Sequence, residues 1–275
     1  MAQADASEPL ILEQRGSVAL LVLNRPAVHN AVNAAMMKRL EQALETLERW
    51  QPRVVIVTGA GERSFCAGAD LGDIARHPEP RYGREMSRRM KVVLSRLADG
   101  PRPVIAAVNG NTLGGGCEVL LACHLRIAVA SARFGFRQAA MGVVTGWGGM
   151  RRALRLLGRG PALRLLLTAE TIDAAEAQRL GLVDGLVERP DQLMEEALSL
   201  AQRIAANAEG SVAAFLELAR VYELDGPEAT DERETERFSE LWSSAHFRRR
   251  VAEWASRSGS AQGPAAAAPS PEPKQ

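Results

Sequence analysis

Aromatic side chains and excess charge are both scarce in this sequence. Phenylalanine, tryptophan and tyrosine make up 4% of the 275 residues, and the formal net charge is +1. Proteins that bind single-stranded nucleic acid stack bases on aromatic rings and follow the backbone with a basic groove. The composition therefore gives little support to nucleic-acid binding, and the near-neutral charge gives none to association with an acidic membrane surface.

Cysteines are also few, and the first apolar run is short. Cys66, Cys117 and Cys123 form no C-x-x-C pair and show no metal-ligand spacing, which indicates reduced thiols and predicts no metal site. The run "SVALLVL" at 17–23 is too short to cross a bilayer, and the first residues lack the basic and apolar regions of a signal peptide. We therefore expect a cytoplasmic protein without a membrane partner.

Hydrophobic periodicity predicts an α/β fold. Four segments rich in leucine, isoleucine and valine indicate strands: 10–24 (two strands around a turn), 53–61, 102–110 and 125–130. Two segments between them carry apolar residues at helical spacing: Met36, Leu40, Leu44 and Leu47 in the first, and Met86, Met90, Val93 and Leu97 in the second. From about residue 148 the pattern is helical almost to the end, and alternation of strands with helices in the first half favours α/β.

The chain divides into four regions. Residues 1–8 form an N-terminal tail, 9–200 the core, and 201–257 a helical C-terminal region. Residues 258–275 are rich in proline, alanine and serine without apolar periodicity, so we expect a disordered tail.

Two glycine-bearing loops each follow a predicted buried strand. They are "FCAGADL" at 65–71 and "LGGGCE" at 113–118. Loops at the carboxyl ends of parallel strands converge on one crevice, and glycine lets a backbone N–H approach a ligand closely. Two such N–H donors could form an oxyanion hole. The alternative is that both loops are only tight turns; neither matches the G-x-x-x-x-G-K-[ST] pattern of a nucleotide-binding P-loop.

Glu118 stands in the first turn of the helix predicted after the triple glycine. A carboxylate there can stabilise the helix start. Its apolar neighbours, such as Val119 and Leu120, instead suggest a partly buried carboxylate with a raised pKa, suited to proton transfer. The residues alone leave both roles open.

Four segments together resemble the crotonase superfamily of enoyl-CoA hydratases and isomerases, in one collinear order over roughly residues 9 to 257. They are "LNRPAVHNAVN" (23–33), "SFCAGADL" (64–71), "RPVIAAVNGNTLGGGCEVLLACHLRIA" (102–128) and "GWGGMRRALRLLG" (146–158). The resemblance implies a spiral of ββα units and a helical C-terminal region that mediates trimers, often paired into hexamers. It also implies an acyl-CoA substrate, with coenzyme A entering as part of that substrate, and no metal or redox cofactor.

The resemblance also assigns roles to individual positions. The backbone N–H groups of Ala69 and Gly115 would hold the thioester oxygen, and Glu118 matches the first catalytic glutamate. The substrate-binding positions it implies are Ala67, Gly68, Asp70, Leu71 and Gly114, with Asp70 organising its loop rather than performing chemistry. Trp147 either shapes the acyl pocket or packs at the start of a helix.

One departure from the family pattern limits the mechanism. Counting from Phe134 to Gly142 places Gln138 where the second hydratase glutamate belongs. Glutamine can hydrogen-bond water but cannot take or give a proton at neutral pH. The sequence therefore predicts an enoyl-CoA hydratase or dehydratase that uses Glu118 as its single proton carrier.

Three other functions stay open. "GVVTGWGGMRR" (142–152) resembles the corresponding stretch of ethylmalonyl-CoA decarboxylases, which need the oxyanion hole but no base. An enoyl-CoA isomerase is less favoured, because isomerases usually keep their base near the position of Gln138. A non-catalytic acyl-CoA-binding homologue would show Gln138 as its first visible loss. Acyl chain length, branching and the choice between trimer and hexamer cannot be read from the sequence.

Overall fold

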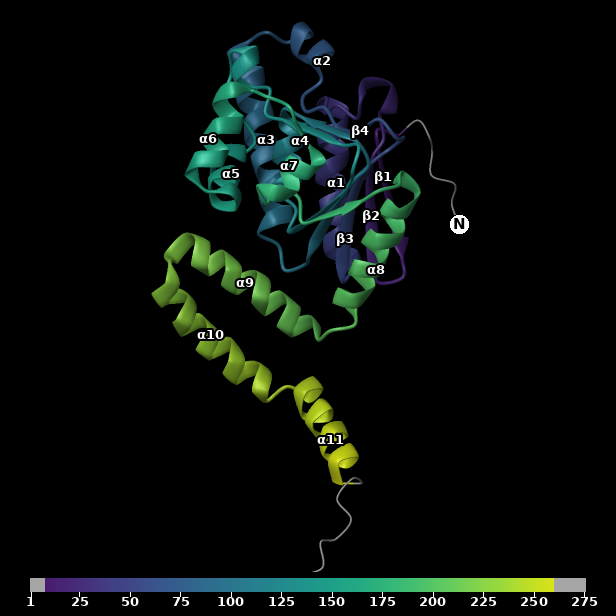
Figure 1. The fold of residues 1–275 in the computed structure, drawn as a ribbon, viewed down its shortest axis with the longest axis vertical. Coiled ribbons are helices and arrows are strands. Elements are labelled where there is room, and N and C mark those ends of the chain that lie inside the picture. Colours follow the sequence, from purple (N-terminus) through teal and green to yellow (C-terminus); the bar gives the residue numbers. More distant parts are fainter. Residues whose placement is uncertain (1–7, 260–275) are drawn as a thin grey trace, which may run out of the picture.

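Two sheets form the centre of the molecule in the computed structural model, which describes residues 8–259 (Figure 1). The larger sheet has the order β1-β2-β3-β5-β7-β10. Its strands are β1 (Leu10–Arg15), β2 (Val18–Leu23), β3 (Val54–Gly59), β5 (Val104–Val108), β7 (Leu125–Val129) and β10 (Gly185–Val187). The first two strands pair antiparallel and the rest are parallel. All the strands predicted from apolar runs are present, and β10 was not predicted.

A smaller sheet lies beside the larger one and was missed by the sequence analysis. It has the order β4-β6-β8-β9, with β4 at Ser64–Cys66, β6 at Asn111–Leu113, β8 at Arg133–Gly135 and β9 at Ile172–Asp173. Strands β4, β6 and β8 each follow a strand of the larger sheet and precede a helix. This repetition is the succession of ββα units that the family resemblance implied.

Two long amphipathic helices bury the stripes predicted for them. They are α1 (Ala34–Trp50) and α3 (Pro80–Ala98), which pack against each other. The shorter helices are α2 (Leu71–Arg76), α4 (Gly115–Leu120), α5 (Gly149–Leu157), α6 (Arg159–Thr168), α7 (Ala174–Arg179) and α8 (Leu193–Ala205). Short 3₁₀ turns occupy Pro26–Val28, Ala139–Met141 and Pro190–Gln192. Helix α8 packs on β3 and β5 and crosses the boundary predicted at residue 200.

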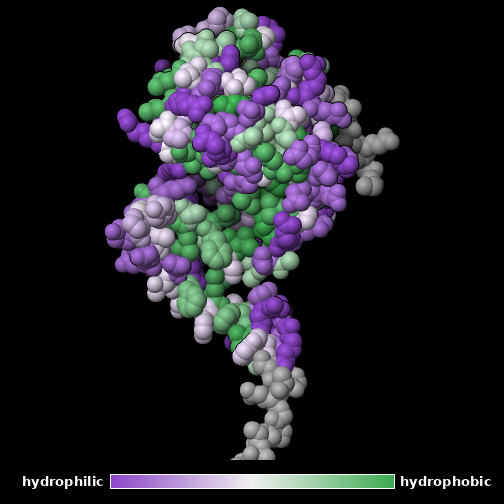
Figure 2. Space-filling view, viewed as in Figure 1, coloured by the Kyte–Doolittle hydropathy of each residue, from purple (hydrophilic) through white to green (hydrophobic). Residues whose placement is uncertain are grey.

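The last three helices form an arm that extends from the sheets, as Figure 1 shows. They are α9 (Glu209–Asp225), α10 (Pro227–Trp242) and α11 (Ala245–Gly259). Hydrophobic side chains reach the surface where the arm leaves the body of the molecule (Figure 2). The arm therefore carries apolar surface that a single chain does not cover.

The predicted tails lie almost entirely outside the described residues; only residue 8 of the first, and 258 and 259 of the second, are described. Between residues 8 and 259, no helix is both long enough and apolar enough to span a membrane.

Candidate active site

The loop after β4 and the turn after β6 lie against each other at one end of the smaller sheet. Gly68 has φ +89°, and a Cβ added there would stand 2.5 Å from the backbone nitrogen of Gly115. A Cβ on Gly116 would collide with the carbonyl oxygen of Cys66. Because two backbones approach this closely, glycine is required on both sides, and the two glycine-bearing loops form one structure.

The backbone N–H groups of Ala69 and Gly115, the two positions the family resemblance selected, have no acceptor among residues 8–259. Ala69 is held by a bridge to Val32: Val32 N donates to the oxygen of Gly68 at 2.7 Å, and Asp70 N donates to the oxygen of Val32 at 2.9 Å. Both residues are partly buried, and Gly115 begins α4, where the first N–H groups have no partner within the helix. The pair is therefore available to a ligand oxygen.

Glu118 is 1% exposed and accepts four hydrogen bonds. Its Oε2 accepts from the backbone nitrogens of Trp147 at 2.7 Å and Gly149 at 2.8 Å. Its Oε1 accepts from the backbone nitrogen of Gly146 and from Nε2 of Gln138, both at 3.2 Å. The carboxylate therefore lies in a cage of N–H donors.

The surroundings of the Glu118 carboxylate bear on its two possible roles, which are to stabilise the start of a helix and to transfer a proton. Burial raises the pKa of Glu118, and the four N–H donors offset that shift only in part. Glu118 lies in the first turn of α4, as predicted, but its carboxylate accepts a hydrogen bond from the backbone nitrogen of Gly149, the first residue of α5. A Cβ on Gly149 would stand 2.6 Å from Cγ of Glu118, so the helix start fits closely around it. Glu118 thus stabilises the start of α5, and its burial and raised pKa are those expected of a proton carrier.

Gln138 lies beside Glu118, where counting along the sequence placed it. Its Nε2 donates to the carboxylate, whereas its Oε1 is buried and has no hydrogen-bond partner among the described residues. This amide oxygen is an acceptor without a donor, directly next to the candidate proton carrier.

Trp147 lies next to both Gly115 and the carboxylate of Glu118. Its side chain is buried, and a Cβ added to Gly115 would collide with the six-membered ring of the indole. Its backbone nitrogen binds Glu118. Trp147 therefore packs at a helix start and lies over a candidate oxyanion donor at the same time.

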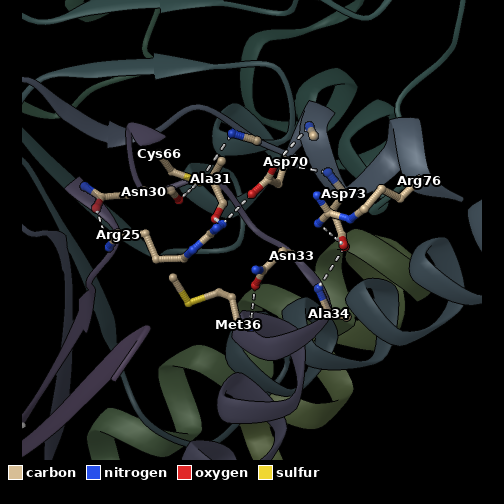
Figure 3. Close-up of polar contacts among 12 residues, drawn as sticks. Arg25, Asn30, Ala31, Asn33, Ala34, Met36, Cys66, Asp70, Asp73 and Arg76 are labelled. Carbon is tan, nitrogen blue, oxygen red and sulfur yellow. Dashed lines mark hydrogen bonds and ion pairs between the residues drawn. The ribbon is translucent and has the colours of Figure 1, made fainter. Parts of the chain in front are cut away.

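A network of polar contacts fixes the loop that carries Ala69 (Figure 3). Arg25 Nη1 donates to Oδ2 of Asp70 and to the oxygen of Ala31, both at 2.7 Å. Oδ1 of Asp70 accepts from the backbone nitrogens of Gly72 and Asp73, at the start of α2. The Arg25 hydrogen bond and the two backbone donors hold the pKa of Asp70 below its usual value. Asp70 thus organises the loop through an ion pair and a helix cap.

Asn30 hydrogen-bonds to the backbone just before the same loop. It is fully buried with φ +58°, and its Nδ2 donates to the carbonyl oxygens of Ser64 at 2.7 Å and Ala60 at 3.1 Å. The backbone nitrogen of Ala67 donates to the carbonyl oxygen of His29 at 3.0 Å. Leu71, the first residue of α2, has a largely exposed side chain. The segment 25–32 therefore positions the candidate substrate-binding residues.

Several of these residues were not predicted from the sequence. Gly146 and Gly149 were not identified as donors to Glu118, nor were Arg25 and Asn30 identified as supports of the loop. All four lie within segments that carried the family resemblance, which was the only available signal for them.

Among residues 8–259 the possible metal ligands are dispersed, and the thiol next to Glu118 is buried. Between residues 8 and 259, no three histidine, cysteine, aspartate or glutamate side chains gather as they would around a metal ion. Cys117, next to Glu118, is fully buried, and burial raises the pKa of its thiol to about 12. It is therefore not a nucleophile at neutral pH.

This chain is similar in sequence and in structure to known enoyl-CoA hydratases. The family model for enoyl-CoA hydratase/isomerase matches residues 13–259. The short-chain-enoyl-CoA hydratase of Clostridium acetobutylicum is 42% identical over 204 residues, covering 74% of this chain and 77% of that protein. The crotonyl-CoA hydratase of Syntrophomonas wolfei is 38% identical over 75% of this chain and 79% of its own length. A crystal structure of an enoyl-CoA hydratase from Bacillus anthracis superimposes with a TM-score of 0.86 at 31% identity, covering 90% of this chain and 96% of that one.

Proposed function

Since this chain belongs to the enoyl-CoA hydratase/isomerase family, we propose that it is an enoyl-CoA hydratase that adds water to the double bond of a 2-enoyl-CoA thioester. One observation supports this most directly: a buried carboxylate, Glu118, lies next to the turn that carries an unpaired backbone N–H. Together they supply a proton carrier and an oxyanion site, the two elements that hydration requires.

The unpaired N–H groups of Ala69 and Gly115 would bind the thioester oxygen. When water adds to C3, the electrons of the double bond move toward this oxygen and an enolate forms. Donors already aimed at the developing charge stabilise it without reorganisation, and one such donor contributes roughly 2.7–4 kcal/mol. The Arg25–Asp70 ion pair would keep the Ala69 loop in place during this step.

Glu118 would carry the proton in both directions. As an anion it accepts a proton from the attacking water while the oxygen forms its bond to C3. The resulting acid then returns that proton to C2 of the enolate, which completes hydration and restores the carboxylate. Gln138 gains and loses no proton in this scheme, so one glutamate performs both transfers.

A panel of acyl-CoA esters tests the reaction class. The purified protein would be incubated with crotonyl-, branched 2-enoyl-, 3-hydroxyacyl-, methylmalonyl- and ethylmalonyl-CoA, and the products followed by mass spectrometry. Gain or loss of water supports the hydratase. Loss of CO2 would instead make it a decarboxylase, and binding without turnover would make it an acyl-CoA-binding homologue.

The rate of hydration should fall on the acid side with an apparent pKa above 4.5, the ordinary value for glutamate. Burial raises the pKa of Glu118, and hydration needs its ionised form, so activity increases as the pH rises through that pKa. The measurement is kcat/KM for crotonyl-CoA from below pH 4.5 up to pH 9, with circular dichroism at each pH. An acid limb at or below pH 4.5 in folded protein would contradict this assignment.

Trp147→Ala should extend the accepted acyl chain. The indole lies over Gly115, where the thioester would bind, and so limits the space for the first acyl carbons. We expect the kcat/KM ratio of hexenoyl-CoA to crotonyl-CoA to rise about tenfold, since the two additional methylenes contribute about 0.8 kcal/mol each when buried. The free energy of unfolding should fall by about 3–5 kcal/mol because a large buried ring is removed.

Trp50→Ala is the matched control for that substitution. Trp50 ends α1 and its side chain is partly exposed, away from the site. The same ratio should stay unchanged in this variant. An unchanged ratio in Trp147→Ala itself would remove Trp147 from the acyl pocket.

We further propose that the chain assembles through its arm as a homotrimer, which can pair into a hexamer. Five large apolar side chains of α9, α10 and α11 are more than half exposed: Phe215, Tyr222, Phe238, Trp242 and Trp254. Contacts between subunits would cover them, and sedimentation or light scattering would give the mass of the assembly. We also propose a cytoplasmic enzyme whose only coenzyme is the CoA of its substrate.

A further inference from the structure

A serine of helix α3 reaches the turn whose backbone nitrogens bind Glu118. The hydroxyl of Ser87 donates to the carbonyl oxygen of Gly146 at 2.5 Å, across 59 residues of sequence. A serine inside a helix can satisfy its hydroxyl on a carbonyl of the preceding turn, but Ser87 donates to another segment instead. This contact joins α3 to the turn that surrounds the candidate proton carrier.

The acceptor of that hydroxyl and a donor to Glu118 belong to one peptide group. The carbonyl of Gly146 and the N–H of Trp147 are the two ends of a single planar amide. This N–H donates to Oε2 of Glu118 at 2.7 Å, the shortest of the four hydrogen bonds that the carboxylate accepts. A chain of two short hydrogen bonds therefore runs from Ser87 through the Gly146–Trp147 peptide to Glu118.

Hydrogen bonds in such a chain polarise one another, by roughly 10–30% per bond. A donor on the carbonyl oxygen draws electron density along the amide, so the N–H of the same peptide becomes a stronger donor. A stronger donor favours the ionised form of the carboxylate that accepts it. The Ser87 hydroxyl thus counteracts the burial of Glu118, which favours the neutral form.

Helix α4, which carries Glu118, packs on β4, β6 and α5. Besides Glu118, the ionisable side chains of these elements are Cys66, Cys117, Arg151, Arg152 and Arg155. Burial raises the pKa of both thiols to about 12, so they are uncharged at neutral pH. Arg152 is buried and interacts electrostatically with Glu118, whereas Arg151 is exposed and Arg155 pairs with Glu223. Guanidinium groups stay charged at these pH values, so a titration near neutral or acidic pH reports the carboxylate itself.

We propose, on the basis of the hydratase function above, that Ser87 is a positioning residue for this reaction. Its hydroxyl acts through the Gly146–Trp147 peptide to stabilise the ionised carboxylate of Glu118, the form that accepts a proton from the attacking water. Ser87 contacts neither the water nor the substrate in this scheme, and it gains and loses no proton. It keeps Glu118 ionised at a lower pH than burial alone would allow.

Ser95 provides a matched comparison on the same helix. Its oxygen accepts from Nη2 of Arg152 at 3.3 Å, and Nη1 of Arg152 donates to the carbonyl oxygen of Trp147 at 3.0 Å. That carbonyl shares its peptide with the N–H of Gly148, which is not one of the four donors that Glu118 has within residues 8–259. Ser95 therefore helps to hold the same turn but lies outside the chain that reaches Glu118.

The experiment follows the ionisation of Glu118 by carbon-13 NMR, in protein labelled at the carboxyl carbons of its glutamate side chains. The signal of Glu118 is the one absent from Glu118→Gln. In Ser87→Ala we expect the titration midpoint to rise by about 0.3 pH unit, because the hydrogen bond from the Trp147 N–H becomes roughly 10–30% weaker. Ser87→Thr, which keeps the hydroxyl, and Ser95→Ala should titrate as the wild-type protein does.

The pH profile of the rate gives a second measurement. On its acid limb, kcat/KM of Ser87→Ala for crotonyl-CoA should fall about twofold, the factor that corresponds to a displacement of about 0.3 pH unit. The plateau should stay nearly unchanged. A serine that only held the turn in shape would lower the plateau and leave the acid limb in place.

Three results would overturn the inference: an unchanged midpoint in Ser87→Ala, an equal displacement in Ser95→Ala, or a displacement in Ser87→Thr as large as that in Ser87→Ala. Circular dichroism and urea unfolding verify that the compared variants are folded. Failure of the hydratase proposal has a different signature, since the wild-type protein would then turn over no enoyl-CoA. The NMR midpoints are measured without substrate, so they still decide whether Ser87 acts on Glu118.

Discussion

Glu118→Gln is expected to slow hydration of crotonyl-CoA by roughly 10²–10⁴-fold, the usual contribution of a general acid–base group. Glutamine has nearly the same shape but cannot carry the proton between water and C2. Because we propose that the loops around Ala69 and Gly115 provide most of the contacts to the substrate, the dissociation constant of butyryl-CoA should change less than about threefold. Steady-state kinetics and calorimetric titration measure the two quantities separately.

The same substitution should also weaken the fold. All four groups around the Glu118 carboxylate are N–H donors, and the –NH2 of glutamine would face some of them without an acceptor. We expect the free energy of unfolding to fall by about 1–3 kcal/mol. Turnover must therefore be compared at a temperature where both proteins are folded. Unchanged turnover in folded Glu118→Gln would exclude Glu118 as the proton carrier.

The stability of the wild-type protein has a pH dependence that the glutamine variant lacks. The pKa of Glu118 is raised in the folded state above 4.5, so ionisation opposes folding. Its contribution to stability is complete below pH 4.5 and is lost as the pH rises through the folded pKa. This loss should be absent when urea unfolding of Glu118→Gln is followed across the same pH range.

Gly68→Ala is expected to lower kcat by roughly 10²–10³-fold, the effect of losing one oxyanion donor. The added Cβ would stand 2.5 Å from the nitrogen of Gly115. The two loops must then separate, which moves the N–H groups of Ala69 and Gly115 apart. The positive φ of +89° at this position adds backbone strain for any residue other than glycine.

Gly181→Ala is the control that isolates the loop contact from the backbone strain. Gly181 follows α7 and has φ +78°, and an added Cβ there meets nothing within 4 Å. Both variants should lose about 1 kcal/mol or more of unfolding free energy, but only Gly68→Ala should lose activity. Full activity in Gly68→Ala would mean that the two amides do not act together on the thioester.

Local pattern predicts the elements that bury long apolar faces and misses those that do not. Strands β3 and β5 were found because each is five or six buried residues long, whereas β4, β6 and β8 have three residues each. Three residues are too few to show an alternation of apolar and polar residues, and these short strands pair with one another in the second sheet. The helix predicted after the triple glycine was displaced for a similar reason: α4 spans Gly115–Leu120, since close backbone packing draws two glycines into it.

The contacts within the site could not be predicted from local pattern either, because they join residues that are far apart in the sequence. Glu118 was identified from its position in a helix and its apolar neighbours, but its backbone donors lie 28, 29 and 31 residues further along the chain. Arg25 meets Asp70 across 45 residues. No spacing rule connects such positions. The residue pattern and the family resemblance therefore indicated Glu118 as the candidate proton carrier, but not the residues that hold its carboxylate.

The carboxylate proposed to carry the proton also anchors the start of α5, and this has an evolutionary consequence. Substitution at position 118 is expected to reduce both turnover and stability, so a descendant that no longer acts as an enzyme would retain the glutamate for its fold alone. A glutamate at this position is therefore a poor indicator of catalysis in distant relatives. Positions 138 and 147, whose side chains border the site without anchoring a helix, are where new substrate preferences in this lineage are expected to arise first.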